Sequence, residues 1–298
     1  MNEKAAGPGE PARPLVLSAS RATDIPAGHG RWFIESLRAG FLTRINPVNG
    51  RARLVDLSRV RAVVFWTKNP APFLPYLAEV LDRGLAPVFQ FTLNDYEAEG
   101  WEPKLPSLSE RVETFRDLAG RLPSGSVIWR FDPLALGPGL SAEGLAGRLE
   151  ALASRLRGFS ERLVVSFLDL YPKVVRRLAR LDARPRPPEP AEAEVLLAAL
   201  GRLGASPGPP LGLYACAEGE DLSAWGLKPG RCVDAELLAR LAPDLAGRRE
   251  LFFSASPGGP FRPRKDRGQR LACGCAPSQD IGRYDTCGLG CVYCYARR

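Results

Sequence analysis

Histidine is almost absent from this chain: His29 is the only one among 298 residues. Catalytic zinc sites of hydrolases commonly take two or three histidine ligands, so a single histidine excludes that kind of active site. The chain also has no nucleophile elbow, the sharp turn that presents a catalytic serine in many hydrolases. A Ser-His-Asp mechanism is therefore excluded as well.

Cysteine is absent before residue 216, and all seven cysteines lie beyond that point. An odd number of cysteines, in a chain that starts without the apolar core of a signal peptide, argues against a disulfide framework. Long apolar runs are missing too: the longest, such as AVVFW at 62–66, have the length of a strand and not of a membrane span. We therefore expect a cytoplasmic protein without a membrane partner, whose cysteines serve metal or redox chemistry.

Lysine is rare: six of the 41 basic residues are lysines, and the net charge is +8. Such an excess of positive charge can mark a nucleic-acid-binding protein. The arginines are dispersed along the sequence, however, and Arg, Ala, Gly and Pro are abundant together, as a GC-rich genome would produce. Nucleic acid therefore stays a secondary partner hypothesis.

Short apolar, β-branched or aromatic runs alternate with segments of helical periodicity. The expected strands are 15–20, 62–67, 88–93, 127–132, 163–169 and 211–216. The expected helices are 30–41, 72–85, 108–122, 140–158, 190–204 and 234–247, and a long loop is expected at 254–270. This alternation indicates a parallel sheet covered by helices, and right-handed connections curl such a sheet toward a barrel. The sequence predicts an α/β fold, a partial (β/α)6 TIM-type barrel at 15–250, between a disordered tail at 1–14 and a loop with a C-terminal cysteine-rich segment at 251–298.

Polar residues stand at the carboxyl ends of the expected strands, the face on which parallel barrels place their active sites. Gln90 and Arg130 lie inside otherwise apolar runs, and a buried charge must be paired or bound to a ligand. We therefore predict a polar pocket at this face. Its candidate catalytic residues are Lys68, Gln90, Arg130 and Asp132, with Asn69 and Asn94 beside them as contacts for substrate or cofactor.

The last cysteines have the spacing C-x3-C-x2-C and form the cysteine trio Cys287, Cys291 and Cys294. Thiolates bind zinc or iron–sulfur clusters. Zinc wants four ligands, and two C-x2-C-like pairs, Cys273 with Cys275 and Cys291 with Cys294, would supply them. A [4Fe–4S] cluster normally takes four cysteines, so the trio would leave one iron open to a small molecule.

The trio, with Tyr293 just before its last cysteine, resembles the cluster loop of radical S-adenosylmethionine (SAM) enzymes. The resemblance implies that SAM is the fourth ligand, through its amino and carboxylate groups. It also implies reductive cleavage of SAM to a 5′-deoxyadenosyl radical, and an electron donor such as flavodoxin or ferredoxin. The protein's part would be to orient the substrate and to exclude water.

Four cysteines remain, Cys216, Cys232, Cys273 and Cys275, which we call the cysteine quartet. Four thiols suffice for a second, fully ligated [4Fe–4S] cluster or for a zinc ion. Cys216 could equally be a small residue of the core. The spacing leaves these alternatives open.

From residue 15 onward the chain resembles the domain-of-unknown-function 1848 family, whose C-terminal cysteines are similar to the radical SAM cluster. The stretches that carry the resemblance are SASRATDIP (18–26), VVFWTKNP (63–70), FQFTLNDY (89–96), VIWRFDP (127–133), LYACAE (213–218) and DIGRYDTCGLGCVYCYA (280–296). Radical SAM enzymes carry their cluster loop after the first strand, whereas here it follows the last, so the resemblance implies a circularly permuted barrel. By analogy Tyr293 lies against the adenine of SAM. The residues implied to hold its amino and carboxylate groups are Ser18, Ser20, Arg21, Thr23 and Asp24.

The leading hypothesis is thus a radical SAM-like iron–sulfur enzyme acting on a small-molecule or macromolecular substrate. The main alternative is a non-catalytic zinc or iron–sulfur protein with a basic surface that associates with nucleic acid. A third is an electron-transfer protein that uses its clusters without SAM. The polar strand-end pocket favours the enzyme.

Overall fold

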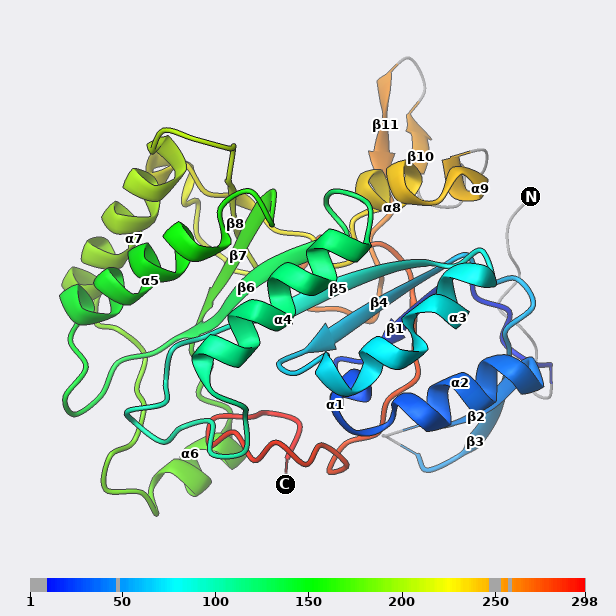
Figure 1. Cartoon of the computed structure of the whole chain (residues 1–298), viewed down its shortest axis with the longest axis horizontal. Helices are drawn as coiled ribbons and strands as arrows, with labels where there is room; N and C mark the ends of the chain where they lie inside the picture. The colour runs from blue at the N-terminus through cyan, green and yellow to red at the C-terminus, as the bar shows by residue number, and fades with distance from the viewer. Residues whose placement is uncertain (1–9, 47–48, 247–252, 257–258, 298) are drawn as a thin grey trace.

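The computed structural model describes residues 10–46, 49–246, 253–256 and 259–297. Its centre is an eight-stranded sheet in the order β12-β1-β4-β5-β6-β7-β8-β9, and every neighbouring pair is parallel (Figure 1). The strands are β1 (Val16–Ala19), β4 (Ala62–Thr67), β5 (Ala86–Thr92), β6 (Val127–Leu134), β7 (Arg162–Phe167), β8 (Gly212–Ala215), β9 (Lys228–Pro229) and β12 (Gln279–Asp280). All six predicted strands are confirmed, with differences of at most two residues at their ends.

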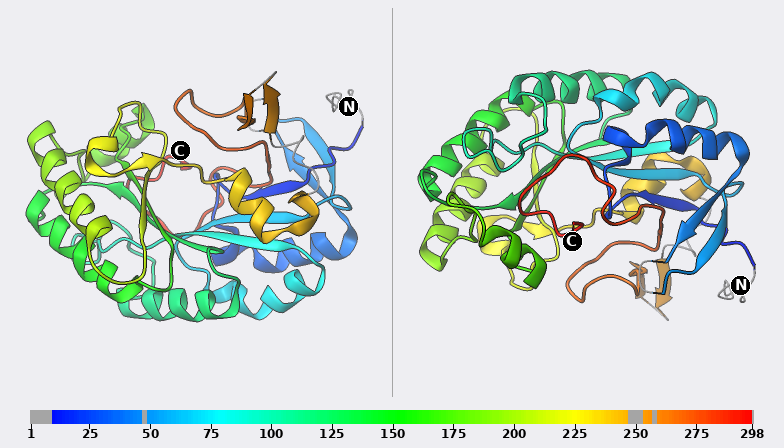
Figure 2. Two further views of the ribbon diagram at one scale, coloured as in Figure 1. Left: turned by 90° about the horizontal axis from the view of Figure 1, so that it is seen from above. Right: turned by 90° about the horizontal axis from the view of Figure 1, so that it is seen from below.

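The helices between the strands lie mostly along the outer side of the curved sheet (Figure 2), but α6 (Pro172–Leu178) lies at the carboxyl ends of the strands, beside the C-terminal segment (Figure 1). They are α1 (Ile25–Gly28), α2 (Gly30–Ala39), α3 (Leu77–Asp82), α4 (Leu108–Arg121), α5 (Ala142–Leu156), α6 (Pro172–Leu178) and α7 (Pro190–Ala205), with the 3₁₀ helices η1 (Ala71–Tyr76) and η2 (Ser223–Trp225). Local chemistry fixes the start of several of them. Ser107 and Glu110 form a capping box at α4, and the Ser141 hydroxyl accepts from the Gly144 amide at α5.

Alternate strand residues face opposite sides of the sheet, which explains the two apolar clusters of the molecule. Val63, Phe65 and their equivalents join the large core beneath the outer helices. Val64, Val88 and their equivalents face the inner side, where α8 (Ala235–Leu241) and the segment before β12 cover them. The inner side of the sheet is therefore filled near the amino ends of its strands, and space is left at the carboxyl ends.

Several expectations need correction. A hairpin of β2 (Phe41–Ile45) and β3 (Ala52–Asp56) interrupts the first helix-to-strand connection, and α6 was not predicted. The loop expected at 254–270 contains a second hairpin, β10 (Phe253–Ser256) with β11 (Gly259–Pro263). The helix expected at 234–247 divides into α8 and α9 (Pro243–Ala246), since Pro243 cannot continue the hydrogen bonding of α8.

The first and the last strand of the central sheet, β1 and β12, lie side by side. Of the tail expected at 1–14, residues 1–9 lie outside the described residues, but Ala12 exchanges backbone hydrogen bonds with Leu54 and Asp56, so the ordered chain begins before residue 15. At the other end, β12 pairs with β1 through Leu17–Gln279 and Ser18–Asp280. The C-terminal segment therefore comes last in the chain but lies beside the first strand of the sheet.

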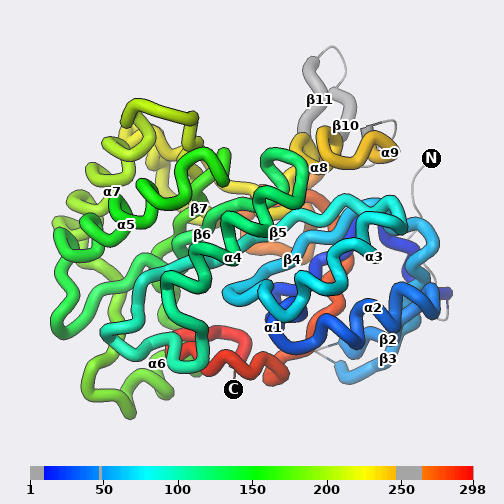
Figure 3. Tube along the Cα trace, in the orientation of Figure 1, coloured from blue at the N-terminus to red at the C-terminus, as the bar shows by residue number. Residues whose placement is uncertain are grey.

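The trio follows β12 and crosses the carboxyl ends of the strands, as the tube in Figure 3 shows in red. Within the described ranges β9 and β12 form the two edges of the sheet and do not pair with each other, so the barrel prediction is confirmed only as a curved parallel sheet alternating with helices. None of the helices in the described part of the chain is both long and apolar enough to cross a membrane.

Candidate functional site

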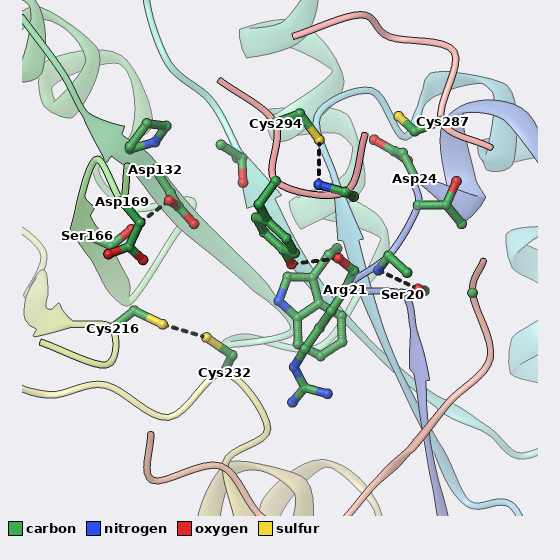
Figure 4. A pocket seen from close by; sticks show the side chains of 18 of the residues that line it. Ser20, Arg21, Asp24, Asp132, Ser166, Asp169, Cys216, Cys232, Cys287 and Cys294 are labelled. Atoms are coloured by element: carbon green, nitrogen blue, oxygen red, sulfur yellow. Dashed lines mark hydrogen bonds between the residues drawn. The ribbon is translucent and has the colours of Figure 1, made fainter. Parts of the chain in front are cut away.

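A cavity of about 720 Å³ opens at the carboxyl ends of the strands. All seven cysteines line it, together with polar residues from the strand ends. Figure 4 shows Cys287 and Cys294 on one side, Cys216 and Cys232 on the other, and Arg21 between them. The structure thus brings both cysteine groups to one pocket.

The trio lies on an irregular loop that is clamped by backbone contacts. Arg177 of α6 donates from Nε to the Val292 carbonyl at 2.7 Å and from Nη2 to the Cys294 carbonyl at 2.5 Å. The Tyr295 hydroxyl donates to the carbonyl of Arg21 at 2.6 Å. Gly290 has φ +78°, a left-handed conformation that glycine adopts without strain, and this turns the chain between the first two cysteines. The loop is held by its backbone, and its thiols are left to face the cavity.

The trio's thiols are partly or wholly buried, and the described residues show no hydrogen bond between any two of their sulfurs. Burial raises the pKa of Cys291 to about 12 and also raises the pKa of Cys287. A bound cation would reverse this preference, because metals bind the thiolate. In the described ranges no three His, Cys, Asp or Glu side chains already have the arrangement of a single-ion site.

Tyr293 is anchored by a buried polar network beneath the trio. Its hydroxyl donates to Glu102, which also pairs with the Lys68 ammonium at 2.7 Å, and Asn94 Nδ2 lies 3.1 Å from the same hydroxyl. Arg111 approaches the second Glu102 oxygen at 3.6 Å. The network fixes the loop to the sheet, so Lys68, predicted as catalytic, is engaged in holding Tyr293.

Asp280, at the end of β12, organises the segment implied to bind SAM. Its carboxylate accepts from the Ser18 and Ser20 hydroxyls at 2.5 and 2.9 Å, and from the backbone amides of Arg21 and Gly282 at 2.9 and 3.0 Å. Both serine hydroxyls are therefore already used to join β1 to β12. What the segment offers the cavity is its backbone, Thr23 and the guanidinium of Arg21.

Arg130 and Asp132 form a buried pair on the cavity wall. Arg130 Nη2 lies 2.5 Å from Asp132, whose other oxygen accepts from the Ser166 hydroxyl at 2.6 Å. Burial opposes the charge on Asp132, but Arg130 and Ser166 outweigh it and lower its pKa. The second face of the guanidinium reaches the quartet, with Nη1 2.8 Å from the Cys232 sulfur. Arg130 thus connects a carboxylate at the cavity to a thiol.

The remaining predicted residues divide into those at the cavity and those behind it. Thr23 and Asp24 line it, and burial raises the pKa of Asp24 to about 6 against its hydrogen bonds from Lys68 and Ala27. Gln90 lies behind the wall, where its amide donates to the Cys232 carbonyl at 2.8 Å. Asn69 accepts from the Ala71 amide at the start of η1, so it serves a turn. Asn94 and Ser18 are also buried behind the lining.

Three donors at the cavity have no partner in the described structure. They are Arg21 Nη2, Thr23 Oγ1 and Arg130 Nε, each with its atom buried. Buried donors without partners are costly, because their hydration is lost without replacement. They are consistent with a polar ligand in the cavity.

Sequence reasoning missed Glu102, Asp280 and Arg177. Glu102 lies in a loop, and only its burial at 7% exposure distinguishes it from a surface acid. Asp280 begins the DIGRYD stretch, and its place just before the trio is a usable signal. Arg177 lies in a helix that was not predicted, so no signal was available for it.

Comparison with known protein families gives a match over nearly the whole chain. The model of the domain of unknown function DUF1848 matches residues 16–296. No curated protein and no solved structure matches the chain.

Proposed function

The chain belongs to the DUF1848 family, and from that premise we propose that it is a radical SAM-like iron–sulfur enzyme. Its open [4Fe–4S] cluster is held by the cysteine trio, and SAM is the fourth ligand. The observation that carries the proposal is the position of the trio. Its loop leaves a parallel edge strand, β12, and presents all three thiols to a cavity at the carboxyl ends of the strands.

The residues present fit such a group. Three thiols face one cavity without hydrogen bonds among them, which suits a multi-iron cluster whose ligands are spread around it. The cavity also has the volume of a site that takes a drug-sized ligand. When bound, the cluster with SAM supplies the electron for reductive cleavage of the cofactor.

The chain's own residues then have distinct tasks. Thr23 and Arg21 offer unpaired donors to the polar end of SAM. Asp280 keeps that segment in place through its four hydrogen bonds. On the opposite wall Asp132, oriented by Arg130 and Ser166, is the ionised group that faces a substrate. The polypeptide around the cavity would keep water away from the groups bound there.

Anaerobic reconstitution with iron and sulfide, followed by EPR of the dithionite-reduced protein, tests the proposal. We expect a [4Fe–4S] signal that shifts when SAM is added. The variant C287A/C291A/C294A should lose this SAM-dependent component. A signal indifferent to SAM, or full retention of iron by the variant, would contradict the proposal.

A further inference from the structure

The quartet comes together from three separate parts of the chain. Cys216 follows β8, Cys232 lies between β9 and α8, and Cys273 and Cys275 precede β12. The Cys216 and Cys232 sulfurs are 3.4 Å apart. Cys275 neighbours both Cys232 and Cys273, and all four thiols line the same cavity, so they form one group.

The surroundings of the quartet favour thiolates. The guanidinium of Arg130 contacts the Cys232 sulfur at 2.8 Å, and the positive charge of Arg21 lies close enough to Cys275 to interact with it electrostatically. The Val233 amide donates to the Cys275 sulfur at 3.4 Å. Two buried cations and a backbone donor directed at one group of sulfurs would stabilise the negative charge that four thiolates carry around a soft metal.

The short sulfur contact of the quartet, between Cys216 and Cys232, is longer than a disulfide bond, and the four thiols would still have to close around an ion to bind it. A disulfide joins its sulfurs at about 2.0 Å, whereas all seven cysteines are free. Four thiolates bound to one zinc ion at about 2.3 Å stand roughly 3.8 Å from one another, close to the contact of Cys216 with Cys232. A fully ligated [4Fe–4S] cluster uses the same four thiolates after they move apart.

A metal centre at the quartet would explain what holds the irregular C-terminal segment in place. Residues 264–297 contain one strand of two residues, β12, among otherwise irregular chain. Long stretches without regular structure are uncommon in compact domains unless something fixes them. A metal centre would take two ligands, Cys273 and Cys275, from this segment and two from elsewhere in the fold. It would therefore tie the segment to the end of β8 and to the loop before α8.

We infer that Cys216, Cys232, Cys273 and Cys275 bind a second metal centre with four thiolate ligands, which is closed to outside ligands and anchors the segment that carries the trio. This centre is independent of the open cluster proposed above. Its chemistry is shared by zinc and by a [4Fe–4S] cluster, and metal analysis separates the two.

The experiment compares two variants of the full chain, each the control for the other. In C287A/C291A/C294A the quartet is intact, and we expect the variant to retain either about one zinc ion or about four iron and four sulfide ions per chain. In C216S/C232S the metal bound by the quartet should be lost. Absence of bound metal from the first variant, or a Cys216–Cys232 disulfide in the anaerobically purified protein, would overturn the inference.

A labelling measurement guards against misfolding of the variants. In the unaltered protein, a thiol reagent followed by mass spectrometry should leave Cys216 and Cys273 unmodified until a chelator removes the metal. Equal modification before and after chelation would also overturn the inference. Failure of the open cluster looks different, because SAM would then leave the EPR signal unchanged while the quartet still held its metal.

Discussion

The trio and the quartet line one cavity, yet they are built in opposite ways. The trio occupies eight consecutive residues on a loop that Arg177 and Tyr295 hold by backbone contacts, and its sulfurs do not hydrogen bond to one another. The quartet gathers three distant segments, and its sulfurs form one group beside two arginines. A local loop can leave one position open for a ligand, whereas a closed set of four distant ligands is suited to holding segments together.

The largest effect should follow from removing a ligand of the trio. For Cys291→Ala we expect SAM affinity to fall by about 100-fold or more, since losing an outer-shell partner alone costs up to that factor. Equilibrium dialysis with SAM, on protein reconstituted without oxygen, measures this. Cys273→Ser is the matched control and should bind SAM within a few-fold of the unaltered protein. Equal losses of SAM affinity in both variants would contradict the distinction between the trio and the quartet.

A smaller effect is expected from Asp280→Ala. It removes the acceptor of four hydrogen bonds, two of them from the buried serines of β1, and should lower the free energy of unfolding by about 2–3 kcal/mol. Urea unfolding monitored by circular dichroism measures the loss. The metal retained by the quartet should not change. Stability equal to that of the unaltered chain would mean that Asp280 does not join β12 to β1.

Arg177→Met should affect the trio alone. It removes the donors to the carbonyls of Val292 and Cys294, so a chelator should extract the trio's iron several-fold faster. Arg176, exposed on the same helix, gives the control Arg176→Met. Chelator-driven release followed by absorbance measures both. Identical release rates in the two variants would show that the clamp does not hold the cluster loop.

The smallest effect is expected from a contact far from both groups. The Arg186 guanidinium hydrogen bonds to Glu192 and lowers the pKa of that carboxyl to about 2. Because the pKa of Glu192 in the folded chain lies below its ordinary value of 4.5, the stability that this pair contributes is present above about pH 4.5 and is lost as the pH falls toward 2. Glu192→Gln should therefore lower Tm slightly at pH 7 and less at pH 3, with unchanged metal content. A change in metal content would show that the metal assays report general stability.

The strands could be predicted because the signal for each of them lies within a few consecutive residues. AVVFWT and VFQFTL are β-branched or aromatic runs of strand length, and any parallel sheet would bury them. The hairpins β2–β3 and β10–β11 were not predicted, although the sequence carries a turn signal at each of them: Asn49-Gly50 in the first and Gly258-Gly259 in the second. The joining of β12 to β1 was expected only through the family resemblance, because two residues of strand carry no periodicity.

The sequence predicted which residues lie at the site better than it predicted the role of each residue. The trio, the quartet, Arg130 and Asp132 all reach the cavity. Ser18, Gln90, Asn69 and Asn94 lie behind the cavity lining, where each hydrogen bonds to another part of the protein. The sequence shows which polar residues follow a strand. It does not show which of them hydrogen bond within the protein, because their partners lie far away in the chain, as Asp280 does for Ser18.

The proposal that SAM completes the trio's cluster is tested most directly by electron–nuclear double resonance on the reduced protein, with SAM labelled at its amino nitrogen and carboxylate. Direct ligation predicts hyperfine coupling from both labelled groups in the unaltered chain and in C216S/C232S, and its loss in C287A/C291A/C294A. SAM that binds without any such coupling would contradict the account.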